Sequence, residues 1–254
     1  MKILVQPFID TTVTKLKDYL LAYYGNGYLW ALQQKQHEML LENCGYTSDI
    51  VNSLWKLIVV EKSIQDSKII ENKERFAEIK KDIENSKDIF VTCSKFKIQP
   101  MLLKKHLDKK YFSSEYGYKE KFDLFGAYQS ELARKKGQDF EKRIHKVLVK
   151  AGYSNFITEG QQKALKNKNN APTPDFLYKE KFDFFKYKDI RWIEVKSYPG
   201  FDKAIFYYGI LKQVKKYSRT YGKGILLLNH GFTKTFKEII EKKTNGKVIV
   251  LAVG

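Results

Sequence analysis

The sequence predicts a mixed α and β protein in two parts, with an all-helical domain over residues 1–126 and a mixed β-sheet flanked by helices over residues 127–254. In the first half, apolar residues recur mainly at helical spacing. In the second half, helical patterns alternate with short runs of strand-forming residues. The length of 254 residues also suits two domains of roughly 125 residues each.

Helical patterns run through most of the first half. Residues 12–43 predict two helices, separated at the glycines of residues 25–27. The Thr-Ser-Asp cluster at 47–49 is a favourable N-cap for a third helix that continues through Ile58. A charged fourth helix is predicted over residues 63–85, where interleaved lysines and glutamates form a solvated face.

Residues 89–111 predict two short segments, the second of them a helix that begins at Pro100. The side chains that this helix would expose are Lys104, Lys105, Lys109 and Lys110. The arrangement resembles a helix-turn-helix, whose second helix lies in a major groove of DNA. A helical hairpin with a lysine-rich face would give the same pattern. Residues 113–126 lack a clear period and are interpreted as a linker.

The second half opens with a helix over residues 129–136, an interruption at Gly137, and a second helix that ends near Ala151. A first strand is predicted at residues 155–159. The basic stretch at 160–170 predicts a mobile loop. Such a loop either closes over a bound nucleic-acid backbone or is an ordinary polar surface loop.

Two further strands are predicted at residues 176–178 and 190–197, which are rich in aromatic and β-branched residues and contain no glycine or proline. They would pair as an antiparallel hairpin with a bent or inserted connection at 179–188. The elements predicted after them are a helix at 201–221, a buried central strand at 224–229, a helix at 233–243 and a last strand at 247–253.

The predicted hairpin brings two carboxylates together, those of Asp175 and Glu194. Mg²⁺ prefers carboxylate oxygens and water and is seldom held by protein alone. Because side chains alternate along a strand, Glu194 and Lys196 project to one face while Val195 projects to the core. Two acids and a lysine in this order suit metal-dependent cleavage of a phosphodiester bond.

The net charge of +18 is concentrated in the second half of the chain. Residues 1–126 hold 20 Lys/Arg and 17 Asp/Glu, a net +3, whereas residues 127–254 hold 27 and 12, a net +15. A lysine-rich genome would raise lysine in both halves alike. The asymmetry therefore favours a nucleic-acid partner, bound with salt-sensitive affinity that depends little on base sequence.

We expect an intracellular protein without a membrane partner, cytoplasmic in a prokaryote or nuclear and cytoplasmic in a eukaryote. No apolar run approaches the roughly 18 residues of a membrane span. Asp10 interrupts the opening segment before the apolar core of a signal peptide develops. The two cysteines, Cys44 and Cys93, lie far apart in the sequence, which favours buried thiols over a disulfide or a zinc site.

Several of these residues together resemble a known family. Proline and aspartate at 174–175 with Glu-Val-Lys at 194–196 resemble the PD-(D/E)xK nuclease superfamily, and Thr-Pro-Asp at 173–175 is similar to its TPD-motif branch, which includes codanin-interacting nucleases. The Gly-Gln-Asp-Phe-Glu run at 137–141 is similar to the opening of that family's first helix. Gln213 and Tyr217 match the QxxxY signature of RecB-like members. The resemblance covers about half of the chain, from Tyr128 to Gly254, and implies a restriction-endonuclease-like fold.

The resemblance and the chemistry together assign roles to individual residues. Asp175 and Glu194 would hold Mg²⁺ or Mn²⁺, with the carbonyl of Val195 as a further ligand. Lys196 would position the attacking water or stabilise the charged phosphate. Glu141 would add a ligand or an outer contact.

The resemblance also implies that Gln213 and Tyr217 orient the substrate or Lys196. The leading hypothesis is thus a metal-dependent nuclease that acts on DNA in preference to RNA. Specificity for a particular DNA structure is compatible with this hypothesis. The alternative is an adaptor that keeps the nuclease fold and binds nucleic acid or protein without useful turnover. Some members of the TPD branch bind a scaffold protein, which makes such a partner a second expectation from the resemblance.

Overall fold

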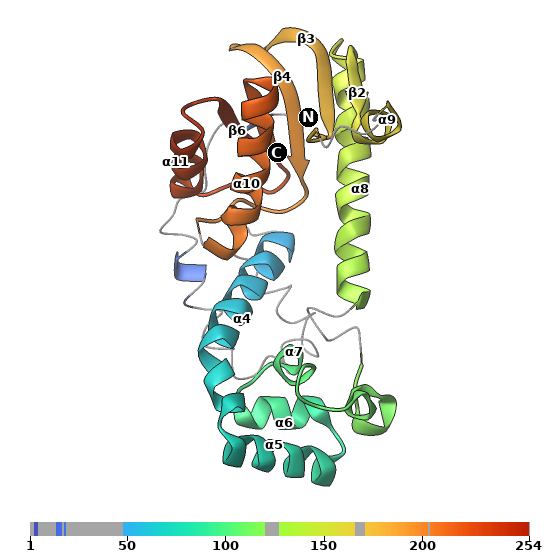
Figure 1. Cartoon of the computed structure of the whole chain (residues 1–254), viewed down its shortest axis with the longest axis vertical. Helices are drawn as coiled ribbons and strands as arrows, with labels where there is room; N and C mark the ends of the chain where they lie inside the picture. Colours follow the sequence, from blue (N-terminus) through green and yellow to red (C-terminus); the bar gives the residue numbers. More distant parts are fainter. Residues whose placement is uncertain are drawn as a thin grey trace. The chain divides into compact units, whose positions relative to one another are not determined.

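The computed structural model describes residues 3–4, 14–16, 18, 48–119, 127–165, 171–202 and 204–253. The chain divides into two compact units, one formed by Met1–Val13 with Lys135–Gly254 and the other by Thr14–Arg134 (Figure 1). The two helices predicted within residues 12–43 lie almost entirely outside the described residues, as does half of the predicted linker, residues 120–126. No helix in the described ranges is long and apolar enough to cross a membrane.

The described part of the unit Thr14–Arg134 is helical, as predicted. Its elements in chain order are α4 (Ser48–Glu71), α5 (Lys73–Ser86), α6 (Ile89–Phe96), α7 (Pro100–Leu103), and the 3₁₀ turns η2 (Lys109–Phe112) and η3 (Ser114–Tyr116). The predicted break between Ile58 and Ser63 was wrong, because α4 continues unbroken to Glu71. The break falls instead at Asn72, whose side chain caps α5 by accepting a hydrogen bond from the backbone N–H of Arg75 at 2.9 Å.

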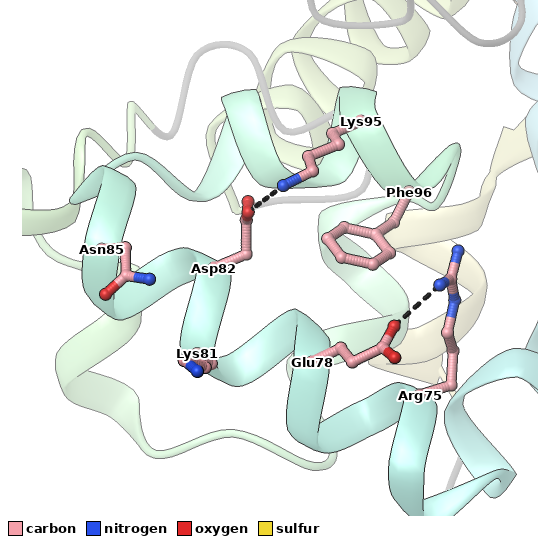
Figure 2. A pocket seen from close by; sticks show the side chains of 7 residues that line it. All are labelled: Arg75, Glu78, Lys81, Asp82, Asn85, Lys95 and Phe96. Carbon is pink, nitrogen blue, oxygen red and sulfur yellow. Dashed lines mark hydrogen bonds and ion pairs between the residues drawn. The ribbon is translucent and has the colours of Figure 1, made fainter.

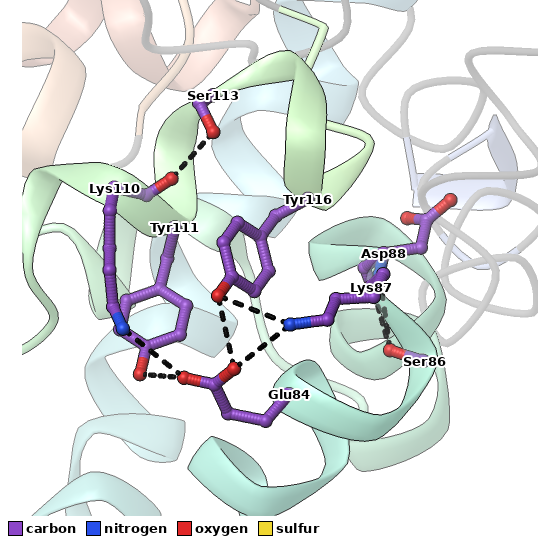
Figure 3. A network of polar contacts seen from close by, with 8 residues as sticks. All are labelled: Glu84, Ser86, Lys87, Asp88, Lys110, Tyr111, Ser113 and Tyr116. Atoms are coloured by element: carbon purple, nitrogen blue, oxygen red, sulfur yellow. Dashed lines mark hydrogen bonds and ion pairs between the residues drawn. The ribbon is translucent and has the colours of Figure 1, made fainter.

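The predicted lysine-rich second helix after Pro100 was also wrong. Helix α7 is a single turn, because the chain then folds back so that Tyr111 and Tyr116 pack into the helical core. Both tyrosine hydroxyls donate to the carboxylate of Glu84, which also accepts from Lys110 at 3.4 Å (Figure 3). Hydrogen bonds from Tyr111, Tyr116 and Lys87, in that order, and then the charge of Lys110 lower the pKa of Glu84 to about 2. DNA binding by this region stays a prediction, but the lysine-rich second helix that was expected to enter the major groove does not form.

A hollow of about 430 Å³ lies against α5 and α6 of this unit (Figure 2). Its lining residues are Arg75, Glu78, Lys81, Asp82, Asn85, Lys95 and Phe96. Both of its acids are ion-paired within the hollow, Glu78 with Arg75 at 2.8 Å and Asp82 with Lys95. Both acids that line the hollow therefore already have a cationic partner.

The other unit is built on a mixed open sheet whose strand order is β1-β6-β5-β4-β3-β2. The strands are β1 (Ile3–Leu4), β2 (Phe156–Thr158), β3 (Phe176–Phe184), β4 (Tyr187–Lys196), β5 (Gly224–Leu228) and β6 (Val248–Val253). Strands β2, β3 and β4 pair antiparallel, whereas β4, β5 and β6 pair parallel. The predicted mixed α and β class is confirmed. The two-residue strand β1, antiparallel to β6, was not predicted.

Helices cover both faces of this sheet (Figure 1). On one face α8 (Ala127–Lys150) buries Phe140, Ile144 and Leu148 against alternate residues of β4 and β5. On the other face α10 (Ala204–Tyr221) and α11 (Lys234–Lys243) pack against the intervening strand residues. Burial on both faces explains why β5 is a continuous apolar run, as predicted.

Three local predictions in this unit need correction. Helix α8 runs unbroken through Gly137, because a lone glycine weakens a helix without ending it when neighbouring turns are packed. Glu159, predicted to end the first strand, and residues 160–165 of the predicted loop form helix α9 (Glu159–Leu165). Gln161 accepts a hydrogen bond from the backbone N–H of Thr158 at 2.8 Å and so fixes the first turn. Residues 166–170 lie outside the described part. Strands β3 and β4 extend across the predicted connection at 179–188, with shifts in register.

Candidate functional site

The antiparallel pairing of β3 with β4 brings Asp175 beside Glu194, as predicted. Phe176, the first residue of β3, pairs with Ile193 of β4. Because the two strands are antiparallel, Asp175, which precedes Phe176, faces Glu194, which follows Ile193. Glu194 Oε2 accepts from the backbone N–H of Asp175 at 3.2 Å, and Asp175 Oδ2 accepts from the backbone N–H of Val195 at 2.7 Å. Each carboxylate is thus held by the backbone of the opposite strand.

Lys196 completes the grouping, because it lies two residues after Glu194 and projects to the same side of β4. Its Nζ donates to Glu194 Oε1 at 2.5 Å. Glu194 is only 1% exposed, although it is charged in most environments. A carboxylate at this depth is rarely retained unless it is paired or binds a metal.

Burial raises the pKa of both carboxylates, to about 6 for Asp175 and about 7 for Glu194. The charge of Asp175 raises the pKa of Glu194 further. Burial alone would lower the pKa of Lys196, but the charge of Glu194 and their hydrogen bond outweigh it, and the lysine stays a cation. With one ammonium group, bonded to Glu194, beside two acids, the group keeps excess negative charge when both acids are ionised.

Two glutamates extend the negative field around this pair. The side chain of Glu141 is partly buried on α8, and its pKa is raised by burial and then by the charges of Glu159 and Glu194. Glu159 was not among the predicted site residues, although it ends the predicted first strand. Its backbone N–H donates to the carbonyl of Asp175 at 3.1 Å, and its side chain pairs with Lys163 at 2.7 Å. Among the residues that the structure describes, however, no three Asp, Glu, His or Cys side chains gather closely enough to form a metal ligand set.

The segment before Asp175 is held by three side chains, which we call the carbonyl clamp: Gln162, Tyr217 and Tyr221. Tyr221 donates its hydroxyl hydrogen to the carbonyl of Pro172 at 2.7 Å, and Tyr217 donates to that of Thr173 at 3.1 Å. Gln162 Nε2 donates to the carbonyl of Pro174 at 2.7 Å. Three consecutive carbonyls thus each accept a hydrogen bond from helix α9 or α10.

The two residues of the QxxxY pattern both belong to this arrangement. Gln213 Nε2 donates to the hydroxyl oxygen of Tyr217 at 2.7 Å, and that hydroxyl then donates to Thr173. Tyr217 is only 4% exposed and packs edge-on against Trp192, at 5.3 Å between ring centroids. The structure therefore joins this pair to the backbone that leads into Asp175, rather than to the side chain of Lys196.

Tyr198 is a further neighbour that the sequence interpretation did not name. It follows Lys196 by two residues, so the alternation that aligned Glu194 with Lys196 could have indicated it. Partial burial raises its pKa, Lys196 opposes this rise, and Glu194 and Asp175 add to it. Its side chain keeps 36% exposure, which leaves an aromatic surface beside the buried acids.

A family model described as "Protein of unknown function TPD sequence-motif" matches residues 114–252. The matched range contains Asp175, Glu194, Lys196 and all members of the carbonyl clamp. No curated protein and no solved structure matches the chain.

Proposed function

The chain belongs to the TPD sequence-motif family, and from the geometry of its site we propose that it is a metal-dependent nuclease of the PD-(D/E)xK superfamily. It would hydrolyse phosphodiester bonds of nucleic acid, with DNA preferred over RNA. The restriction-endonuclease-like identity of the sheet and the RecB-like identity of the QxxxY helix belong to the same proposal. The observation that carries it is the pairing of the buried carboxylate of Glu194 and the partly buried carboxylate of Asp175 with one lysine, where β3 meets β4.

The donor set fits a divalent cation. Asp175 and Glu194 present hard carboxylate oxygens, which Mg²⁺ and Mn²⁺ prefer. Their pKa values are raised by burial, so ionising both in the absence of a cation is unfavourable. We propose that these two residues and the Val195 carbonyl hold the metal, with Glu141 as a further ligand or an outer contact. When bound, Mg²⁺ or Mn²⁺ would supply an acidified water and positive charge at the attacked phosphate.

The chain's own residues then have separate tasks. Lys196 is fixed by Glu194, so its ammonium group is held at a defined point beside the acids, where it positions the attacking water or stabilises negative charge on the phosphate. Val195 donates its N–H to Asp175 and so orients that carboxylate. The carbonyl clamp fixes the backbone before Asp175 and limits how far that carboxylate can move.

The charge distribution supports a nucleic-acid substrate. Residues 127–254 hold 27 Lys/Arg against 12 Asp/Glu, although the centre of the site is acidic. A basic surface around an acidic, metal-binding centre draws in the phosphate backbone and releases its counterions. We therefore expect binding that weakens steeply as the salt concentration rises.

The experiment that tests this proposal incubates the full-length protein with single-stranded, duplex, flap and junction DNA and with RNA, each with and without Mg²⁺ or Mn²⁺. Calorimetric titration with each metal, on the wild type and on Asp175→Asn, measures the metal site independently of cleavage. Cleavage that needs metal and is lost in Asp175→Asn supports the proposal. Absence of both metal binding and cleavage across the panel refutes it.

One observation favours the alternative of an adaptor without useful turnover. Among the described residues no third acid, histidine or cysteine joins Asp175 and Glu194 closely enough to form a ligand set, and Glu194 is already engaged by Lys196. An adaptor would bind nucleic acid or a scaffold protein, the latter expected from family resemblance, and it would bind equally well with and without divalent metal. Metal titration therefore separates the two functions.

A further inference from the structure

Arg143, on helix α8, reaches the loop that follows strand β5. Its Nη2 donates to Asn229 Oδ1 at 2.5 Å, and its guanidinium carbon lies 5.1 Å from the centroid of the Phe140 ring. The backbone N–H of Asn229 donates in turn to the carbonyl of Lys196 at 2.9 Å. Two hydrogen bonds therefore connect the guanidinium group to the backbone of the lysine in the candidate site.

The contacts of Asn229 leave the positive charge of Arg143 intact. Only the amide oxygen of Asn229 can accept from a guanidinium, so the amide nitrogen faces His230 Nε2, 2.9 Å away. Within the described residues Arg143 pairs with no carboxylate, and its side chain is exposed. The structure thus holds a cation in a fixed direction without neutralising it.

The loops at this edge of the sheet are tied together. The backbone N–H of Gly200 donates to the carbonyl of Gly231 at 2.9 Å, and that of Thr233 donates to the carbonyl of Gly200 at 2.9 Å. A Cβ atom at Gly200 would lie 2.6 Å from the Phe236 ring, so glycine is required for this close approach. Ligands of open sheets bind outside the carboxyl ends of parallel strands, and β4 and β5 both end here.

From these contacts we propose that Arg143, oriented by Asn229, binds a backbone phosphate of the nucleic-acid strand next to the phosphate cut at Lys196. This inference rests on the proposed nuclease function. A guanidinium presents several N–H donors in a planar fork that matches phosphate oxygens, and one donor given to Asn229 leaves others for the ligand. The subsite reads the charge and geometry of the backbone and not the bases.

The test measures binding of the full-length protein, in the presence of a chelator, to a fluorescent single-stranded DNA of about 20 nucleotides over a range of salt concentrations. Arg143→Ala should weaken binding about 10-fold and lower the slope of affinity against salt by about one phosphate contact. Lys150→Ala is the matched control, because it removes one exposed charge from the same helix about 10 Å further along. It should lower affinity far less.

A second variant separates the effect of the Arg143 charge on DNA binding from the effect of the size of the Arg143 side chain. Asn229→Asp keeps Arg143 but places a carboxylate against it, so it should reproduce the affinity loss of Arg143→Ala. In a set of DNA probes, each probe carries one neutral methylphosphonate in place of a phosphate. At one position, this loss of charge should weaken DNA binding by the wild type and leave DNA binding by Arg143→Ala unchanged.

Arg143→Ala binding as well as Lys150→Ala would overturn the subsite, whether or not the protein cleaves DNA. Arg143-dependent binding without metal-dependent cleavage would retain the subsite and reject the nuclease. The two proposals therefore fail through different observations.

Discussion

Replacing Asp175 by asparagine should stabilise the protein in the absence of metal while it removes a ligand of the proposed metal site. Burial raises the pKa of Asp175 from 3.8 to about 6. Because the folded state binds this proton more tightly than the unfolded chain does, the contribution of the group to stability is fully present below about pH 3.8 and is lost as the pH rises through about 6. The amide of the variant carries no proton that must be released, so the variant avoids this loss.

The size of the effect follows from the shift. A rise of about two pKa units corresponds to about 3 kcal/mol at a pH well above 6, since each unit is worth about 1.4 kcal/mol. Part of this stability difference comes from Glu194, because removing the charge of Asp175 lowers the pKa of Glu194. We expect Asp175→Asn to exceed the wild type by up to about 3 kcal/mol at pH 8 and to match it near pH 4.

Denaturant unfolding in the presence of a chelator, followed by fluorescence between pH 4 and pH 8, measures this difference. Glu180→Gln is the control, because it removes an exposed carboxylate from β3, the strand that begins directly after Asp175. Adding Mg²⁺ at pH 8 should stabilise the wild type but not Asp175→Asn, since only a folded state with both ligands binds the ion. A stability difference that does not change with pH would refute the reasoning about burial.

Three further outcomes are expected. Glu194→Ala should abolish metal-dependent cleavage and the calorimetric signal of metal binding while the fold is retained; undiminished cleavage would contradict the assignment. Lys196→Arg should reduce single-turnover rates nearly as much as Lys196→Ala, by about 10²-fold or more, because a broad guanidinium cannot occupy the place of a compact ammonium; a near-normal rate would withdraw the lysine from the chemistry. Tyr217→Phe and Tyr221→Phe should each lower the unfolding free energy by about 1–2 kcal/mol, because each leaves a carbonyl unpaired, and each should lower kcat more than it raises KM. Tyr208→Phe, at a site 61% exposed, is the control. Equal losses of stability in all three variants would contradict the role of the carbonyl clamp.

The pairing of Asp175 with Glu194 could be predicted from the sequence because it follows from local rules. Alternation along a strand places Glu194 and Lys196 on one side, and two strand-like runs close in sequence favour a hairpin. The carbonyl clamp could not be predicted in the same way. The bonds from Tyr217 to Thr173 and from Tyr221 to Pro172 join residues 44 and 49 positions apart, and no periodic pattern encodes a contact between a side chain and a distant backbone carbonyl.

The helical part of the chain shows the opposite limit, where a local pattern was present and tertiary contacts overrode it. Pro100 and the lysines after it favour a helix, yet the chain leaves the helical path after Leu103. Tyr111 and Tyr116 are buried and bonded to Glu84, which lies on a helix distant in sequence. Burial of two aromatic rings outweighs the small preference of a few residues for one conformation.

The carbonyl clamp and the raised pKa values both concern two neighbouring acids that are partly or fully buried and that repel one another when both are ionised. When Asp175 and Glu194 are both ionised without a cation, each gains by moving away from the other into solvent. Glu194 cannot move, because it lies on the central strand β4 and is 1% exposed. Asp175 lies just before the start of β3, where strands fray most easily, and it could turn outward if its backbone were free. The Val195 N–H holds its carboxylate, while the carbonyl clamp holds the three carbonyls before it. These bonds keep the two carboxylates together at a cost in stability. Under the proposed function, a site preorganised in this way would bind a cation without first having to assemble its ligands.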